Sequence, residues 1–344
     1  MHRCRITLCL ALILPLVLQC FPMSALADGG RWVATGPGGG LVNVLAPSPA
    51  YVTDHTFFAG TGNGVFVSQD GGKSWSSVSS DLSWSSVWSL AVAADDASSY
   101  TLFAGTADAG IYVSRQGGTV WEYTSADYYD AGVYWLACSP RFAADGTLFA
   151  ATDYGLLRST DWGASWAPSD SGLPDEIVYA VALSPQYGSD RTAWAAVANT
   201  GIFRSTDAGA TWQPAYNGLG IPDIWAILPS PLYSQDRTVF VATAGDGVYR
   251  SVDGGVSWAP ARQGMGLALV WNLAASPNYA LDRTLLASTG GGGMYLSSDG
   301  GNSWHSISVG LTDPLVWAVA FSPTYGADRT LLAGAQETPP SRER

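Results

Sequence analysis

The chain has 344 residues, of which 47% are hydrophobic and 13% are charged, and it contains 40 glycines and 15 tryptophans. This composition excludes intrinsic disorder and is typical of a strand-rich globular protein. The formal net charge of -12 disfavours nucleic acid and anionic lipid as partners, because like charges repel.

The first 27 residues have the pattern of a secretory signal peptide. A basic start at residues 2–5 precedes an apolar run from Ile6 to Val17, and small residues lead up to Ala27. The apolar run is shorter than the roughly 20 residues that a membrane span needs. We therefore expect cleavage after Ala27 and a single mature domain over residues 28–344. That domain would be secreted or otherwise extracytoplasmic, in the periplasm or at the cell surface, with no membrane insertion after cleavage.

Most of the chain consists of repeats of about 46 residues, a period typical of propeller blades. Each repeat contains short apolar runs bounded by Gly, Pro and Asp, which is the pattern of four strands joined by turns. The sequence therefore predicts an all-β protein, a seven-bladed β-propeller with six full blades. The repeats start near Val42, Val87, Val133, Val178, Ile224, Val270 and Val316.

The seventh repeat is cut short. Residues 316–335 supply its first two strands, but QETPPSRER follows in place of a third strand. At the other end of the chain, Asp28-Gly-Gly-Arg-Trp32 is similar to the last part of a repeat. We expect an incomplete seventh blade that is shared by the N- and C-termini and lacks one strand.

The last two strands of each full repeat are joined by the pattern Ser-x-Asp-x-Gly-x-Ser/Thr-Trp. The Asp can accept hydrogen bonds from backbone amides of the turn, and the Gly tolerates a positive φ. The second repeat departs from the pattern because Gln116 replaces the Asp, so its turn should be the least well held. The structural aspartates that this pattern predicts are Asp70, Asp161, Asp207, Asp253 and Asp299.

A meandering blade sends its loops to two opposite faces. The turns between the first and second strands and between the third and fourth strands carry the repeated motifs, and we call their side the repeat face. The other loops vary between repeats and form the irregular face. Acidic and aromatic residues in these loops are typical of sugar-binding surfaces, although ordinary solvated loops explain them equally well. The candidate ligand-binding residues are Trp84, Asp127, Tyr128, Tyr129, Asp130, Asp175 and Tyr216.

Specific catalytic motifs are absent from the sequence. It contains no G-x-S-x-G, H-E-x-x-H or C-x-x-C pattern. His55 and His305, the histidines of the mature chain, stand at repeat positions that other repeats fill with ordinary residues. We therefore assign no catalytic residue, no metal ligand and no cofactor.

The repeated turn pattern resembles the Asp-box, or BNR repeat. Its texture is similar to that of sortilin-type propellers and of the photosystem II assembly and stability factor family over most of residues 32–335. This resemblance implies a propeller that serves as a binding platform for peptides or proteins. We therefore expect an exported, non-catalytic, monomeric propeller whose partner is a protein or a carbohydrate.

Two enzyme families share this repeat, so a glycoside hydrolase acting on an extracellular polysaccharide is the alternative. Xyloglucan-specific endoglucanases resemble the chain in repeat texture, but they clasp a cleft between two propellers. Sialidases require three gathered arginines with a Tyr and Glu pair, which the sequence hardly supplies. A glycosidase also needs two carboxyl groups roughly 5 to 9.5 Å apart, and Asp130 with Asp175 is the pair to consider.

Overall fold

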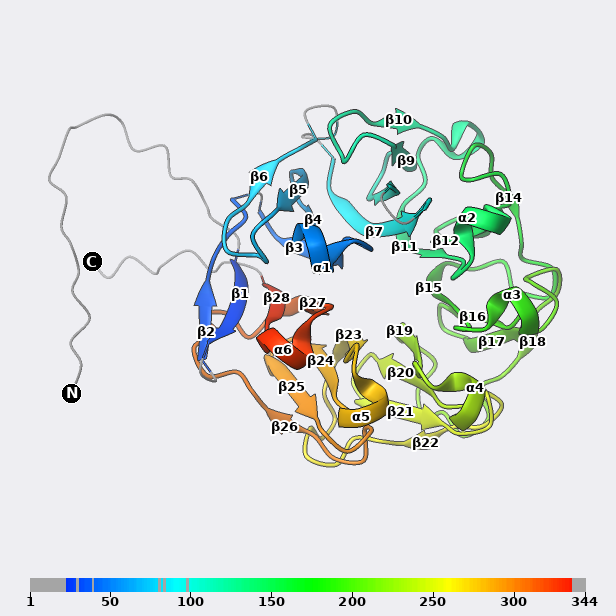
Figure 1. Cartoon of the computed structure of the whole chain (residues 1–344). Coiled ribbons are helices and arrows are strands. Elements are labelled where there is room, and N and C mark those ends of the chain that lie inside the picture. The colour runs from blue at the N-terminus through cyan, green and yellow to red at the C-terminus, as the bar shows by residue number, and fades with distance from the viewer. Residues whose placement is uncertain are drawn as a thin grey trace, which may run out of the picture.

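The strands form seven four-stranded antiparallel sheets arranged around a central axis (Figure 1). This computed structural model describes residues 23–28, 31–38, 40–79, 82, 85–96 and 99–335. Six of the sheets use four consecutive strands each, and the remaining one combines strands from both ends of the chain. The predicted all-β propeller is confirmed.

Each sheet has one strand at the axis and three strands farther out. The innermost strands are β3 (Val42–Pro47), β7 (Val87–Ala94), β11 (Val133–Cys138), β15 (Val178–Leu183), β19 (Ile224–Pro229), β23 (Val270–Ala275) and β27 (Val316–Phe321). The second strands are β4 (Phe57–Thr61), β8 (Tyr100–Thr106), β12 (Leu148–Thr152), β16 (Ala193–Val197), β20 (Val239–Thr243), β24 (Leu285–Thr289) and β28 (Leu331–Ala335).

The outer half of each sheet is a hairpin with a very short last strand. The third strands are β5 (Gly64–Ser68), β9 (Ile111–Ser114), β13 (Gly155–Ser159), β17 (Gly201–Ser205), β21 (Val248–Ser251), β25 (Met294–Ser297) and β1 (Met23–Asp28). The outermost strands are β6 (Ser76–Ser77), β10 (Glu122–Tyr123), β14 (Ala167–Pro168), β18 (Gln213–Pro214), β22 (Ala259–Pro260), β26 (His305–Ser306) and β2 (Arg31–Ala34).

The sheet shared by the termini corrects the expectation of an incomplete blade. It has four strands in the order β2-β1-β28-β27, and β1 supplies the strand that was expected to be missing. Strand β1 pairs with β2, with Ala27 opposite Trp32, and with β28, with Met23 opposite Ala335. The prediction of a missing strand is wrong, because the residues of β1 also have the pattern of the end of a signal peptide. Cleavage after Ala27 would leave only Asp28 of strand β1, and residues 1–22 lie outside the described residues.

The core lies between neighbouring sheets, so the second strands are almost wholly buried. Close approach of two sheets requires small residues at some positions of these strands. A Cβ added at Gly60 of β4 would lie 2.6 Å from a methyl group of Val44 and 2.8 Å from one of Val87 in the next sheet. Close packing at such positions fixes each inner strand relative to the neighbouring sheet.

Six short helices fill the turns between first and second strands on the repeat face. In helix α4 (Tyr233–Asp236), Tyr233 is fully buried, and Asp236 accepts hydrogen bonds from the Ser230 hydroxyl at 2.8 Å and the Thr238 amide at 2.9 Å. Arg237 ends the helix in the left-handed conformation. Asp236 and Arg237 are therefore part of the turn architecture. The equivalent helices are α1 (Tyr51–Asp54), α2 (Phe142–Asp145), α3 (Tyr187–Asp190), α5 (Tyr279–Asp282) and α6 (Tyr325–Asp328).

The Asp-box turn is held by its carboxylate. Asp253 Oδ1 accepts hydrogen bonds from the amides of Val256 and Ser257, each at 3.0 Å, and both Ser251 and Ser257 donate their hydroxyls to this carboxylate. Burial alone would raise the pKa of Asp253, but these hydrogen bonds lower it to about 2. In the second repeat, the backbone carbonyl of Gln116 accepts the hydrogen bonds from Thr119.

In four of the six full repeats, the Trp that follows the Asp-box joins its sheet to the preceding one. The Trp212 indole N–H donates to the Ser169 carbonyl at 2.6 Å, and the Trp258 indole donates to Ala215 at 2.7 Å. Trp32 of strand β2 makes the equivalent bond to Ile307. We call this set of side chains the outer ring; its members are Trp32, Trp75, Trp121, Trp166, Trp212, Trp258 and Trp304.

Candidate ligand site in the axial channel

Each innermost strand has a β-bulge at its second residue. In strand β11, for example, Val133 pairs with Thr152 and Trp135 with Ala151, so Tyr134 is an extra residue without a partner. A bulge bends the strand and changes the direction of the extra side chain. The seven bulged residues are Asn43, Trp88, Tyr134, Tyr179, Trp225, Trp271 and Trp317.

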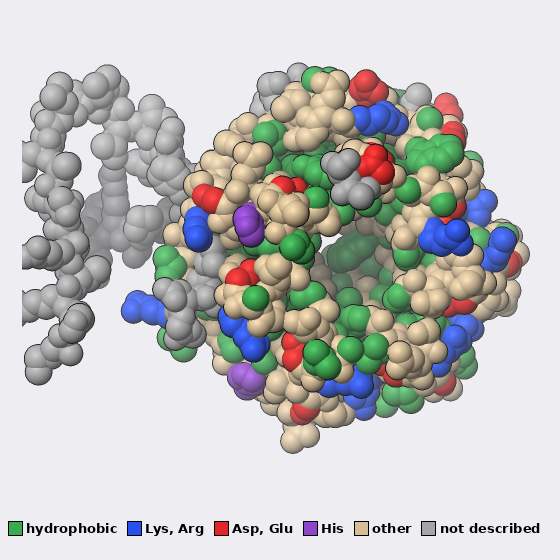
Figure 2. All heavy atoms as spheres, in the orientation of Figure 1, with side chains coloured by type: hydrophobic (Ala, Val, Ile, Leu, Met, Phe, Trp, Pro, Cys, Tyr) green, Lys and Arg blue, Asp and Glu red, His purple; other side chains and the backbone are tan. Residues whose placement is uncertain are grey.

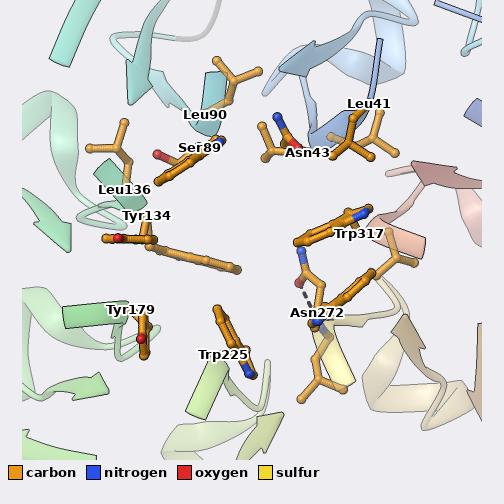
Figure 3. Close-up of a pocket in the computed structure, with 17 residues that line it drawn as sticks. Leu41, Asn43, Ser89, Leu90, Tyr134, Leu136, Tyr179, Trp225, Asn272 and Trp317 are labelled. Atoms are coloured by element: carbon orange, nitrogen blue, oxygen red, sulfur yellow. Dashed lines mark hydrogen bonds between the residues drawn. The ribbon is translucent and has the colours of Figure 1, made fainter. Parts of the chain in front are cut away.

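These bulged side chains line a cavity of about 530 Å³ in the axial channel. The side chains of Tyr134, Tyr179, Trp225 and Trp317 surround a central space (Figure 3). Seen from the repeat face, the centre of the molecule is hollow, with hydrophobic side chains deep inside it (Figure 2). We call the six bulged aromatic residues the inner ring: Trp88, Tyr134, Tyr179, Trp225, Trp271 and Trp317.

The inner ring lies at the end of the channel that belongs to the irregular face. Each innermost strand starts where an irregular loop ends, and the bulge is at its second residue. Backbone bonds tie these strand starts to loops between second and third strands, as in Ala198 N–H to the Ile177 carbonyl at 2.8 Å. The face predicted to bind ligand is therefore also the face nearest to the inner ring.

Neighbouring rings of the inner ring stack on one another. The ring centroids of Trp271 and Trp317 are 3.8 Å apart with an interplanar angle of 18°, and those of Tyr179 and Trp225 are 4.8 Å apart at 24°. Trp88 and Tyr134 are tilted at 5.2 Å. All six side chains remain partly exposed. Mutual stacking thus fixes their orientation while each keeps some surface open to the channel.

Trp135 narrows the channel below the inner ring. It follows the bulge in strand β11 and also lines the cavity. It packs against the buried cluster that contains Ala226 and Leu273, although two other sheets lie between β11 and β23 in the circular order. The corresponding position is Ala180 in strand β15 and Ala226 in β19, so one large side chain fills space that the other repeats leave free.

The lining of the cavity holds few titratable groups. Apart from two tyrosines, none of the described residues that line the cavity has a titratable side chain. Burial raises the pKa of Tyr134, and the charge of Asp153 raises it further. A phenol in this state remains protonated at neutral pH, so the cavity offers no group for general base catalysis.

Those predicted site residues that the structure describes lie in the irregular loops and do not line this cavity. Asp127 and Tyr128 belong to a short 3-10 helix (Ala126–Tyr128), and Tyr129 is 69% exposed. Asp130 accepts a hydrogen bond from the Tyr154 hydroxyl at 2.9 Å, and the rings of Tyr128 and Tyr154 are 6.3 Å apart. The structure thus gathers four side chains, Tyr128, Tyr154, Asp130 and Tyr129, around one loop.

The remaining predicted residues are scattered. Asp175 is exposed in the loop before strand β15. Tyr216 is 43% exposed and its ring lies 6.1 Å from that of Phe203. Trp84 falls outside the described residues.

Sequence reasoning missed the inner ring, although a signal for it was present. An aromatic residue follows the apolar start of six repeats, which gives Trp88, Tyr134, Tyr179, Trp225, Trp271 and Trp317 the same period as the Asp-box. A strand pattern alone assigns such residues to the core. The bulge that turns them into the channel has no sequence signature of its own.

No group of three or more His, Cys, Asp or Glu side chains among the described residues is arranged to hold a metal ion. In the same residues, no helix has the length and apolar character needed to cross a bilayer.

The comparison with protein families matches residues 66–77 to the BNR/Asp-box repeat. These residues run from strand β5 through the turn of Asp70 to strand β6, which is the hairpin described above. None of the curated proteins matches the chain.

Solved structures with the same fold come from several kinds of protein. The GH74 xyloglucanase from Xanthomonas campestris has a TM-score of 0.67 at 20% identity, covering 87% of this chain and 51% of that one. YCF48 from Cyanidioschyzon merolae has a TM-score of 0.61 at 15% identity, covering 87% of this chain and 94% of that one. The extracellular domain of the putative hybrid two component system BT4673 from B. thetaiotaomicron has a TM-score of 0.64 at 16% identity, covering 86% and 37%.

These similarities concern the fold. The chain spans about half the length of the xyloglucanase and nearly the whole length of YCF48. One of the matched structures is of YCF48 bound to D1 peptide. The matched repeat and the arrangement of the sheets together make the chain a β-propeller that carries the BNR/Asp-box repeat.

Proposed function

We propose that the chain is an exported, non-catalytic, monomeric propeller that binds a protein or glycan ligand at the inner ring. The observation that carries this proposal is the cavity of about 530 Å³, which is lined by six aromatic side chains and lies beside the irregular loops. A concave, mostly aromatic cavity of this size is typical of ligand sites. The acidic and aromatic loops then form the outer part of the same site.

A glycoside hydrolase is the less favoured function. Two carboxyl groups on either side of a sugar are needed for that reaction, and no Asp or Glu is among the described residues that line the cavity. The chain also spans only about half of the xyloglucanase that it matches in fold. Peptide binding has support from YCF48, a propeller of similar extent whose structure with D1 peptide is known.

A binding screen with a catalytic readout tests this proposal. Purified protein is titrated with a panel of oligosaccharides, polysaccharides and peptides, and each mixture is also assayed for released reducing ends. We expect at least one ligand that binds without turnover and whose affinity falls at least tenfold in Trp225→Ala. Release of sugar that survives Trp225→Ala and depends on Asp130 and Asp175 would instead establish the hydrolase.

Export and processing are tested by sequencing the N-terminus of the exported chain. Cleavage after Ala27 gives a chain that starts at Asp28. A start at or before Met23 keeps strand β1, which pairs with both β2 and β28. Retention of the whole chain in the cytoplasm would contradict export.

A further inference from the structure

The irregular face is strongly acidic. Its described loops, at residues 35–38, 40–41, 62–63, 78–79, 82, 85–86, 107–110, 124–132, 153–154, 169–177, 198–200, 215–223, 244–247, 261–269, 290–293 and 307–315, contain one cationic side chain, Arg262, which forms an ion pair with Asp246. The other described arginines and Lys73 belong to the repeat face or to the third and fourth strands. The acidic residues of these loops are Asp108, Asp127, Asp130, Asp153, Asp170, Asp175, Glu176, Asp223, Asp246 and Asp313.

Two of these carboxylates belong to loops next to the strand starts that carry the inner ring. Asp153 Oδ1 accepts a hydrogen bond from the Gly132 amide at 3.0 Å, two residues before Tyr134, and its charge contributes to the raised pKa of that phenol. Asp223 Oδ1 accepts from the Asn199 amide at 3.1 Å and is two residues before Trp225. Negative charge is therefore fixed at the edge of the cavity.

Three polar side chains that line the cavity form hydrogen bonds within the protein. Asn43 donates to the Val87 carbonyl at 2.9 Å, Ser89 donates to the Val133 carbonyl at 3.1 Å, and Asn272 accepts from the Leu273 amide at 2.7 Å. Sugar hydroxyl groups need several free hydrogen-bond partners in a binding site. This lining offers mainly the surfaces of aromatic rings.

Aromatic surfaces next to fixed negative charge suit one class of ligand. The face of a Trp or Tyr ring attracts a cation through its quadrupole. Acidic groups at the edge raise the local concentration of cations and bring them to the cavity. A neutral apolar ligand would gain from the rings alone and nothing from Asp153 and Asp223.

We propose that the inner-ring cavity binds an organic cation, such as the ammonium or guanidinium group of a basic peptide or a free quaternary ammonium compound. This inference rests on the proposed binding function and specifies its ligand. The rings of Trp225 and Trp317 would contact the cation, and Asp153 and Asp223 would complement its charge. The shared chemistry is a delocalised or alkylated positive charge.

Calorimetric titration with choline and with its uncharged isostere 3,3-dimethylbutan-1-ol isolates the contribution of the charge. We expect choline to bind at least tenfold more tightly than the isostere, and its affinity to fall as sodium chloride is raised. A short lysine-containing peptide, compared with the same peptide carrying glutamine for lysine, forms the second arm. Tighter binding of the peptide than of choline would identify a basic peptide as the source of the cation.

Matched variants locate the site. Trp225→Ala should weaken choline binding at least tenfold, and Trp225→Phe, which keeps a ring, should restore most of it. Asp153→Asn keeps the acceptor for Gly132 but removes the charge, and it should weaken binding two- to fivefold. Glu122→Gln, on outermost strand β10, is the control and should change nothing. Equal melting temperatures show that the variants are folded.

Three results would overturn the inference. Equal binding of choline and its isostere removes the role of charge. Choline binding that survives Trp225→Ala places the cation elsewhere. If neither choline nor the lysine peptide binds, but a neutral oligosaccharide or uncharged peptide binds in a Trp225-dependent manner, the cation is refuted. The proposed binding function then remains intact. If nothing binds in that manner, the proposed function fails as well.

Discussion

The propeller contains two rings of aromatic side chains with the same period along the chain, and they differ in every other respect. The outer ring of tryptophans is mostly buried: Trp212 is 1% exposed and Trp304 is 4% exposed. The inner ring is partly exposed throughout. Most outer-ring indoles donate to carbonyl groups of the preceding sheet, as Trp304 does to Ala261 at 2.8 Å, whereas the inner rings mainly stack on one another.

This difference distinguishes aromatic residues that stabilise the fold from aromatic residues that are available to a ligand. In the outer ring, most side chains bury their apolar surface in the core and donate their N–H groups to hydrogen bonds between sheets. The inner ring keeps surface that no part of the described protein covers. Periodicity alone places both rings in the core, so burial and hydrogen bonding decide the role.

The outer ring is itself uneven. The Trp75 indole donates to Gly72 within its own turn, at 3.2 Å, and the Trp121 indole N–H is buried without a hydrogen-bond partner among the described residues. Trp121 follows the turn in which Gln116 replaces the Asp. The weakest connections between sheets therefore lie in the first two repeats.

The largest expected effect is the loss of an outer-ring side chain. Trp212→Ala should lower the free energy of unfolding by about 3–5 kcal/mol, because it leaves a cavity in the core and an unpaired carbonyl at Ser169. The matched inner-ring change, Trp225→Ala, should cost about 1–2 kcal/mol, because its side chain is partly exposed. Denaturant unfolding of both variants measures the difference. Equal losses would mean that the inner ring is as structural as the outer one.

Removing an Asp-box carboxylate should have an intermediate effect. Asp253→Ala should lower the free energy of unfolding by about 1–3 kcal/mol, because the amides of Val256 and Ser257 lose their acceptor. Asp175→Ala, which removes an exposed acid on the irregular face, is the control and should leave stability nearly unchanged. If Asp253→Ala melts with the parent protein, the turn does not depend on its carboxylate.

The same carboxylate predicts a pH dependence. The pKa of Asp253 is lowered to about 2 in the folded protein, against about 3.9 in an unfolded chain. Its contribution to stability is therefore complete above about pH 4 and is lost as the pH falls through about 2. The difference in unfolding free energy between parent and Asp253→Ala should shrink over that range. A difference that stays constant down to pH 2 would contradict this assignment.

Repairing the irregular turn should have the smallest effect. Gln116→Asp, combined with Val120→Ser, restores the carboxylate and the hydroxyl of the repeated pattern, and it should raise the free energy of unfolding by about 0.5–1 kcal/mol. Val120→Ser alone serves as the control and should not stabilise. No gain in the double variant would show that the second repeat is already held by its other contacts.

Much of the fold could be predicted from the sequence, because the Asp-box repeats mark the hairpins of the sheets. Closure of the terminal sheet could not, because strand β1 lies in residues that also read as the end of a signal peptide. The irregular loops could be recognised in the sequence, but the inner ring of the proposed site could not. The exposure of a loop residue such as Tyr129 can be predicted from the Gly- and Asp-rich sequence around it. The orientation of Trp225 cannot, because it depends on a bulge that arises only when the strands pair.

The most direct test of the contrast between the two rings is a titration of protein labelled with ¹⁵N at the tryptophan indoles. Substitution of single tryptophans by phenylalanine assigns the N–H signals of both rings, and choline is then added. We expect chemical-shift changes at the indole N–H groups of Trp88, Trp225, Trp271 and Trp317. The signals of Trp212, Trp258 and Trp304 should not move. Shifts confined to the outer ring, or none in the inner ring under any ligand that binds, would contradict it.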